Sequence, residues 1–431
     1  MARAMKESGI EWIGEIPENW EDLRLKYLVT CNDESLGEDT DPDFEFAYVD
    51  IGSVEYGKGI TQRQHICFAE SPSRARRVVR EKDVILSTVR TYLKAVAKID
   101  GYTTPQIVST GFAVLRAREG KVVPDFLNFA VLSDAFVSLV EAKSTGISYP
   151  AINASDVVEI SIPVPPIDEQ KRIAKYLSNQ CARIDAVIEQ TRASIEEYKK
   201  LKQAVITQAV TKGIRPNRRM VNSGAGWLGQ IPDEWAVFRI ANLYDERNER
   251  GTDDLPILTV SINTGISDHE IPDEEKDRVV VRSEDRTLYK RVYPGDLAYN
   301  MMRAWQGAFG AARVDGMVSP AYIVAKPKTP GILDSRYVEA LLRTPSAIEE
   351  MHRYSRGITD FRLRLYWPEF KNICVCVPSL KEQIEIADYI DEKAAEIDAL
   401  IQKKQQLLEI LESYKRSLIF EYVTGKKEIP V

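Results

Sequence analysis

Only a few segments of this 431-residue chain combine residue types and spacings that could carry out chemistry. Residues 52–58 have the spacing GxxxxGK, in which backbone amides and a lysine can hold the phosphates of a nucleotide. The next residue is Gly59, so the hydroxyl group that would bind Mg²⁺ is missing. We therefore interpret the segment as a glycine-rich turn. An enzyme that binds a nucleotide there is a weaker alternative, which an ATP-binding assay on the purified chain would test.

Residues that could bind a metal or act as nucleophiles are also sparse. The acids and the lysine of residues 272–276 fall in one acidic loop, whereas a metal-dependent nuclease needs them on two neighbouring strands. Cys374 and Cys376 have no second cysteine or histidine pair within reach, which disfavours zinc. No Rossmann or Gly-x-Ser-x-Gly motif occurs, and the three histidines are far apart. We expect a non-catalytic chain with no metal or cofactor of its own.

The distribution of charge is more informative than the net charge. A net charge of −7 excludes a uniformly basic protein that coats nucleic acid. Any nucleic-acid site must therefore be a local patch of the surface. Residues 32–55 carry nine acids and no base, and residues 58–98 carry ten bases and three acids. The second half of the chain repeats this trend, with Tyr92 and Trp305 at matching positions among the bases. Basic surface in both halves favours contact with DNA phosphates.

An internal repeat determines how these segments are arranged. Residues 8–20 return as residues 223–235, and residues 169–177 return as residues 382–390, at offsets of 215 and 213. A weaker match joins the segments that end in Arg90 and Arg303. The period is far longer than that of a solenoid repeat, so the chain consists of two copies of one unit.

Each copy ends in a long helix with an apolar stripe. No glycine or proline interrupts either segment, and the apolar residues recur at spacings of three, four and seven, as in a coiled coil. A helix of roughly 43 residues is about 65 Å long, so we expect the two to pair antiparallel, with a globular unit at each end. The expected seam consists of Ile173, Leu177, Ile184, Ile188, Ile195, Tyr198, Val205, Ile386, Ile390, Ile397, Ile401, Leu408, Leu411 and Leu418.

The predicted fold class is α+β, with a pseudo-two-fold internal repeat. Mixed α/β domains are expected at residues 1–165 and 214–378, and the helices at 166–213 and 379–426. Among the expected elements are a strand at residues 255–260 and a helix at 126–140. No run approaches ~18 apolar residues and the five cysteines are scattered, so we expect no membrane span, no disulfide framework and a cytoplasmic location.

These motifs together resemble the specificity (S) subunit of type I restriction–modification systems. The resemblance is carried by Gly-x-Ile-Pro-x-x-Trp at residues 14–20 and 229–235, and by Pro-x-x-x-Glu-Gln at residues 165–170 and 378–383. It covers the whole order of domain, helix, domain and helix. It implies that each globular unit is a target recognition domain for one half of a bipartite, double-stranded DNA sequence, and that the helices are spacers.

The resemblance also implies partners and places the chemistry on them. Two methyltransferase (M) subunits would dock on the helices, and restriction (R) subunits would join that core. S-adenosylmethionine, ATP and Mg²⁺ would then belong to the partner subunits. The alternative from a different functional class is a coiled-coil scaffold that does not bind DNA, which the basic stretches in both halves disfavour.

The residues that contact DNA are expected in two loops of each domain, at residues 88–94 and 144–153 and at residues 300–306 and 355–364. Arginine suits guanine, and asparagine or glutamine suits adenine, in the major groove. Because the loops of the two halves differ in sequence, the target should be asymmetric. The candidates are Arg90, Tyr92, Lys94, Ser144, Ser148, Tyr149, Asn153, Arg303, Trp305, Gln306, Arg356, Thr359, Arg362 and Arg364.

Overall fold

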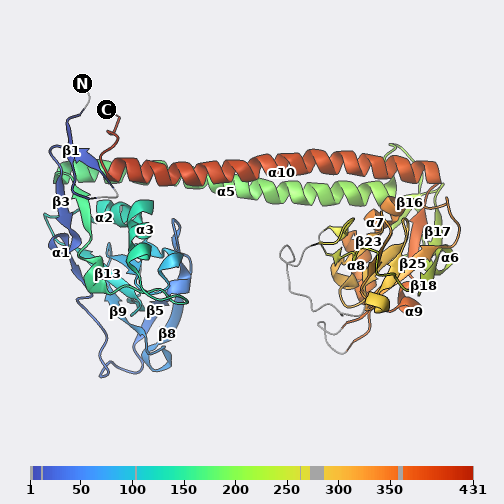
Figure 1. Cartoon of the computed structure of the whole chain (residues 1–431), viewed down its shortest axis with the longest axis horizontal. Helices are drawn as coiled ribbons and strands as arrows, with labels where there is room; N and C mark the ends of the chain where they lie inside the picture. Colours follow the sequence, from blue (N-terminus) through green and yellow to red (C-terminus); the bar gives the residue numbers. More distant parts are fainter. Residues whose placement is uncertain are drawn as a thin grey trace. The chain divides into compact units, whose positions relative to one another are not determined.

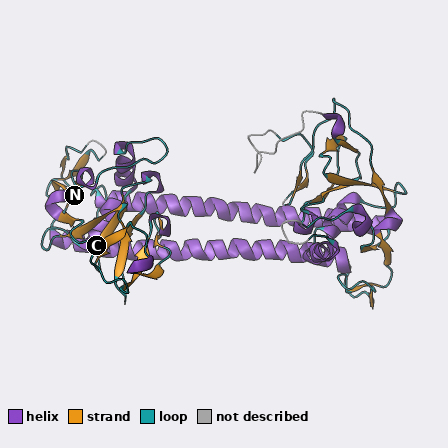
Figure 2. Cartoon of the chain, turned by 90° about the horizontal axis from the view of Figure 1, so that it is seen from below, coloured by secondary structure: helices purple, strands orange, loops and turns teal. Residues whose placement is uncertain are grey.

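The computed structural model describes residues 3–10, 13–101, 104–262, 264–271, 286–357 and 363–430. The chain divides into two compact units. The first unit comprises residues 1–192 and 406–431, and the second comprises residues 193–405. Each unit combines a mixed α/β domain with portions of two long helices, as the labels of Figure 1 and the helix and strand colours of Figure 2 show.

The long helices are α5 (Ile167–Lys212) and α10 (Leu380–Val423). The sequence predicted helices at residues 166–213 and 379–426. A glycine with positive φ follows each helix, Gly213 at 75° and Gly425 at 71°, and this left-handed conformation suits glycine. With 46 residues, α5 is about 69 Å long. No helix among the described residues is long and apolar enough to cross a membrane.

The two helices pair antiparallel within each unit. In the first unit, Asp185 of α5 binds Lys415 of α10, and Arg192 binds Glu412. In the second unit, Lys202 binds Asp398. Of the expected seam, nine residues are buried: Ile173, Leu177, Ile184, Ile188, Ile195, Ile386, Ile390, Ile397 and Leu418. The other five are partly exposed: Tyr198, Val205, Ile401, Leu408 and Leu411.

Two four-stranded sheets form the framework of the first domain. One is antiparallel, in the order β11 (Val96–Lys98), β10 (Val84–Ser87), β13 (Phe112–Ala117) and β4 (Val29–Cys31). The other has the order β8 (Gln64–Cys67), β5 (Glu45–Val49), β12 (Gln106–Ser109) and β9 (Ala75–Val79), with β5 and β12 parallel. Two-stranded ladders join β1 (Met5–Glu7) to β2 (Glu15–Pro17), β3 (Glu21–Arg24) to β14 (Ser161–Val164), and β6 (Val54–Glu55) to β7 (Gly59–Ile60). The helices are α1 (Leu25–Leu28), α2 (Pro124–Leu132), α3 (Asp134–Lys143) and α4 (Ala154–Val157), with short 3-10 turns η1 (Ile51–Ser53), η2 (Phe68–Glu70) and η3 (Thr91–Leu93).

The second domain repeats the antiparallel sheet, in the order β18 (Tyr244–Arg247), β25 (Tyr322–Pro327), β22 (Leu297–Asn300) and β23 (Phe309–Ala311). Its two-stranded ladders join β15 (Met220–Asn222) to β16 (Gln230–Pro232), β17 (Ala236–Arg239) to β26 (Cys374–Val377), β19 (Val260–Ser261) to β20 (Gly265–Ile266), and β21 (Lys290–Val292) to β24 (Gly316–Val318). The helices are α6 (Ile240–Leu243), α7 (Ser335–Leu342), α8 (Pro345–Tyr354) and α9 (Trp367–Phe370), with 3-10 turns η5 (Arg286–Leu288) and η6 (Ala304–Gln306).

Two expected elements differ from the structure. The strand expected at residues 255–260 is wrong, because only Val260 belongs to a strand and Ile257 makes an isolated bridge to Met317. The helix expected at residues 126–140 is two helices, α2 and α3, which Ser133 separates in an extended conformation. Apolar periodicity alone did not reveal this break, since the hydroxyl of Ser133 bonds to the carbonyl of Ala130 and both sides stay buried.

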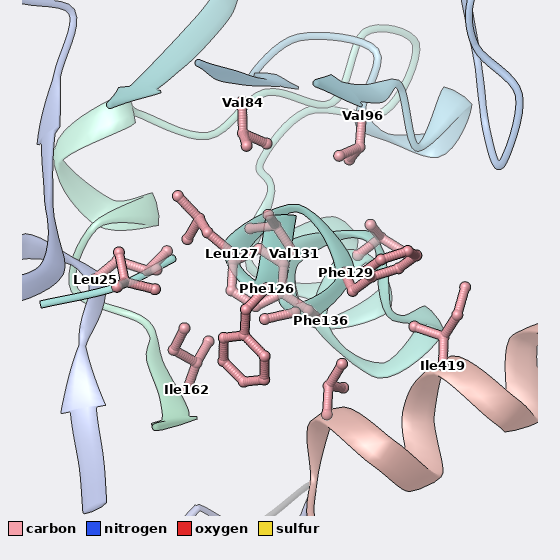
Figure 3. Packing of buried hydrophobic residues seen from close by; sticks show 14 of the residues in the cluster. Leu25, Val84, Val96, Phe126, Leu127, Phe129, Val131, Phe136, Ile162 and Ile419 are labelled. Carbon is pink, nitrogen blue, oxygen red and sulfur yellow. The ribbon is translucent and has the colours of Figure 1, made fainter. Parts of the chain in front are cut away.

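The core of the first unit lies around α2 and α3. Figure 3 shows Phe126, Leu127 and Phe136 between Val84 and Val96 of the sheet and Ile419 of α10. All of these side chains are buried, so the end of α10 completes the core of the first domain. The compact unit therefore extends beyond the expected domain of residues 1–165.

The repeated Glu-Gln pairs attach each long helix to its domain. Gln170 accepts a hydrogen bond from the Val123 amide at 2.7 Å and donates one to the Pro165 carbonyl at 2.9 Å. Gln383 makes the matching bonds in the second unit, to Asp334 and Pro378. The preceding glutamates form ion pairs with arginines, Glu169 with Arg3 and Glu382 with Arg218. The repeated motif is thus explained by helix attachment.

Candidate nucleic-acid interface

In the first unit, the two loops that the sequence singled out lie side by side. The Ile152 amide donates to the Thr88 carbonyl at 2.9 Å, and the Thr91 hydroxyl donates to that of Ser144 at 2.8 Å. Val89 also forms a bridge to Ala151. Residues 88–94 and 144–153, which are about fifty positions apart in sequence, therefore form one surface.

Four of the candidates on this surface are available to a ligand. Arg90 is partly exposed and forms no ion pair with any residue that the structure describes. Its φ of 50° places it in the left-handed region, which is unusual outside glycine. Tyr92 is 48% exposed and Tyr149 is 74% exposed, and Ser148 is also exposed. These groups offer one cation, two aromatic rings and a hydroxyl.

Three other candidates have protein partners. The Lys94 ammonium donates to the Ser138 hydroxyl at 3.2 Å and lies 3.8 Å from carboxylates of Asp134 and Glu141. The Ser144 hydroxyl donates to the Val140 carbonyl. The Asn153 amide donates to Asp156 at the start of α4. Their contacts fix the loops, so these three residues position the surface.

The corresponding loops of the second unit are also joined. The Leu365 amide donates to the Met301 carbonyl at 2.8 Å, and Arg356 and Arg364 exchange backbone hydrogen bonds at 2.9 Å. The rings of Trp305 and His352 meet edge to face at 5.5 Å. Two of the predicted contacts, Thr359 and Arg362, lie outside the described residues.

The candidates of this second surface differ in their availability. Arg364 and Gln306 are exposed and Arg303 is partly exposed, and neither arginine forms an ion pair with a described residue. The Arg356 guanidinium binds Glu369 at 2.8 Å, although 74% of its side chain is exposed. The Trp305 indole donates to the Met302 carbonyl at 3.0 Å, which fixes the turn.

The basic run of residues 58–98 offers less free charge than its composition predicted. Lys58 pairs with Glu55, Arg74 with Asp50, and Arg80 with Glu34, so three of its bases bind the acidic run that precedes them. Lys98 pairs with Asp100 and Asp125. Local basic surface was predicted from this run, and these four bases contribute less free charge to it than their number suggests, because each already binds a carboxylate.

A buried carboxylate in each domain supports the strand that leads to the interface. Asp83 lies directly before β10 and receives two hydrogen bonds from Arg116, at 3.0 and 2.8 Å. Asp296 lies directly before β22 and receives two from Arg247, at 2.7 and 3.2 Å. Burial raises the pKa of Asp296, and the hydrogen bonds from Arg247 partly offset this effect. Sequence reasoning missed these pairs, because the arginines are distant in sequence.

The GxxxxGK segment is a contact with the long helices. Lys58 pairs with Glu55, and the carbonyl of Gly57 accepts a hydrogen bond from Lys415 of α10 at 3.1 Å. The Tyr56 hydroxyl donates to the Leu132 carbonyl. Together with α5 and α10, this turn lines a cavity of about 380 Å³. Among the described residues there is no group of three or more acids, cysteines and histidines that could hold a metal ion.

Comparison with known proteins agrees with this architecture. The family described as "Type I restriction modification DNA specificity domain" matches residues 52–197. The type I restriction enzyme MjaVIII specificity subunit of Methanocaldococcus jannaschii is 22% identical, over 95% of this chain and 93% of that protein.

Two solved structures have a similar fold. The structure described as "Structural basis underlying complex assembly and conformational transition of the type I R-M system" has a TM-score of 0.71 and 22% identity, over 96% of this chain and 99% of that one. The HsdS subunit of Thermoanaerobacter tengcongensis has a TM-score of 0.54 and 24% identity, over 96% and 98%. The chain is thus similar to the specificity subunits of type I restriction–modification systems over nearly its whole length, and its residues 52–197 match the family of their DNA specificity domain.

Proposed function

We propose that this chain is the non-catalytic subunit that recognises DNA sequence for a type I restriction–modification complex. The observation that carries the proposal is that each domain joins two distant loops into one exposed surface. In the first unit this surface presents Arg90, Tyr92 and Tyr149, and in the second it presents Arg303 and Arg364. Arginine and aromatic side chains on projecting loops suit contacts with phosphates and base edges.

Each domain recognises one half of a bipartite target, and the two halves differ. The loop of residues 144–153 has no charged residue, whereas the matching loop of residues 355–364 contains Arg356, Arg362 and Arg364. Surfaces with such different chemistry select different base pairs. The target is therefore asymmetric.

The long helices set the gap between the half-sites. A coiled coil about 69 Å long limits two readers to a separation of at most about two turns of DNA, since one turn is roughly 34–36 Å. We expect centres about one turn apart on one face of the duplex. The pairing of α5 with α10 in each unit supports a stiff spacer.

The helices also dock two methyltransferase subunits, and restriction subunits join this core. Apolar side chains that the pairing leaves exposed support such a contact: Val187, Leu201, Leu400, Leu407, Ile410 and Tyr414. Adenine methylation with S-adenosylmethionine, and cleavage with ATP and Mg²⁺, then belong to these partners. We expect the complex to be located in the cytoplasm and to bind DNA there.

The proposal is tested by mapping adenine methylation across the host genome with this gene intact and deleted. Deletion should abolish methylation at one gapped, asymmetric motif. If methylation is unchanged although the methyltransferase subunit is expressed, the scaffold alternative is favoured over this proposal.

A further inference from the structure

The loop of residues 144–153 holds apolar side chains in solvent at the edge of the first interface. Ile147 is 103% exposed and Tyr149 is 74% exposed, and the adjoining loop exposes Tyr92 and Leu93. A single exposed apolar residue is ordinary, but a group of them on a protein surface marks a binding site.

The backbone beneath this tip is fixed. Thr145 and Ala151 exchange two hydrogen bonds, at 2.8 and 2.9 Å, and the Ile152 amide is bound to the Thr88 carbonyl. Gly146, with a φ of 108°, allows the chain to turn at the tip. A loop whose base is fixed in this way loses little conformational entropy when its tip binds a ligand.

The chemistry of the tip limits what it can recognise on DNA. Residues 144–153 contain no charged side chain, so the tip itself cannot form an ion pair with a phosphate. The adjoining loop, which is hydrogen-bonded to this one, carries a partly exposed cation, Arg90. On the edges of the bases in the major groove, the only apolar group is the 5-methyl group of thymine.

Building on the proposed function, we propose that Ile147, with Tyr149 beside it, recognises a thymine in the first unit's half-site through its 5-methyl group. The contact removes the aliphatic side chain and the methyl group from water together. The matching loop of the second unit contains three arginines, so this mode of recognition belongs to one half-site.

The test uses the chain assembled with its methyltransferase subunits. The DNA is a duplex that carries the motif identified by methylation mapping. Each thymine of the half-sites is replaced singly by deoxyuridine, which lacks the methyl group. One replacement should weaken binding by the wild-type complex about three- to fivefold, the worth of one buried methyl-sized group. The Ile147→Ser complex should bind the thymine duplex about three- to fivefold more weakly than the wild-type complex does. Its affinity should not change further when that thymine is replaced by deoxyuridine.

A matched control is Ile332→Ser, which removes a 48%-exposed isoleucine of the second unit outside the loops of the interface. It should bind like the wild type and respond to deoxyuridine like the wild type. Thermal unfolding should be unchanged for Ile147→Ser, because this side chain is fully exposed.

Two outcomes overturn the inference alone. In the first, the Ile147→Ser complex binds the thymine duplex as tightly as the wild-type complex does. In the second, Ile147→Ser weakens binding, relative to the wild-type complex, by the same factor on the thymine duplex and on the deoxyuridine duplex. In both, the wild-type complex still binds its motif, so the proposed function stands. Absence of any motif-specific binding by the wild-type complex would instead overturn the proposed function, and this inference with it.

Discussion

Asp185 and Lys415 form an ion pair at 2.6 Å across the paired helices, and the same relationship recurs between Asp398 and Lys202 at 2.6 Å. Each residue of one pair has its counterpart 213 positions away, the offset of the Glu-Gln repeat. The internal repeat of the sequence thus extends to individual contacts between the helices. In the first unit, Lys415 also binds the carbonyl of Gly57 and thereby holds the domain on the helices.

Replacing Lys415 by methionine should lower the free energy of unfolding by about 1–2 kcal/mol, because it removes the ion pair and the bond to Gly57. The Lys415 side chain is only 13% exposed. The control Lys202→Met removes an ion pair in which the lysine side chain is 31% exposed. It should lower the free energy of unfolding by about 0.5 kcal/mol. Chemical denaturation of the purified variants measures both values. Equal losses would contradict the role of Gly57.

The ion pair between Arg218 and Glu382 should contribute more than any of the exposed pairs. Its side chains are 10% and 6% exposed, so Arg218→Ala leaves a buried carboxylate without its partner, at a cost of about 3–5 kcal/mol. The neighbouring control, Arg219→Ala, removes a side chain that is 82% exposed and should change stability by less than ~0.5 kcal/mol. Urea unfolding distinguishes the two, and similar values would show that the helix attachment is not fixed by this pair.

Arg364 and Lys94 should differ in their effect on DNA binding. Arg364→Ala should weaken binding by the assembled complex by about 1–3 kcal/mol and relax the choice of base at one position. Lys94→Ala should have a much smaller effect, because its ammonium already binds the α3 side chains of Ser138, Asp134 and Glu141. Titration of the motif duplex at fixed salt measures both. A larger loss for Lys94→Ala would reverse these assignments.

The sequence predicted the elements that depend on local patterns. Both long helices follow from the absence of glycine and proline together with the spacing of residues such as Ile173 and Leu177. The sequence predicted residues 88–94 and 144–153 as two separate loops. It could not predict that they lie side by side, because the hydrogen bond between Ile152 and Thr88 depends on the tertiary fold.

What the sequence could not predict is which charges are already neutralised. Arg80 is bound to Glu34 and Arg116 to Asp83, and these partners lie more than thirty positions away. A count of bases along the chain does not distinguish these paired arginines from Arg90, which has no ion-pair partner among the described residues. Availability to DNA is therefore a property of the folded surface.

The central claim, two DNA readers at a distance set by the helices, is tested most directly by shortening both helices together. Deleting residues 193–199 of α5 and the facing residues 402–408 of α10 removes seven residues from each and keeps the order of the seam. The spacer becomes about 10 Å shorter, so mapping of adenine methylation should show the same two half-sites with a gap shorter by one to three base pairs. Methylation at the original gap, or half-sites of changed sequence, would contradict the account.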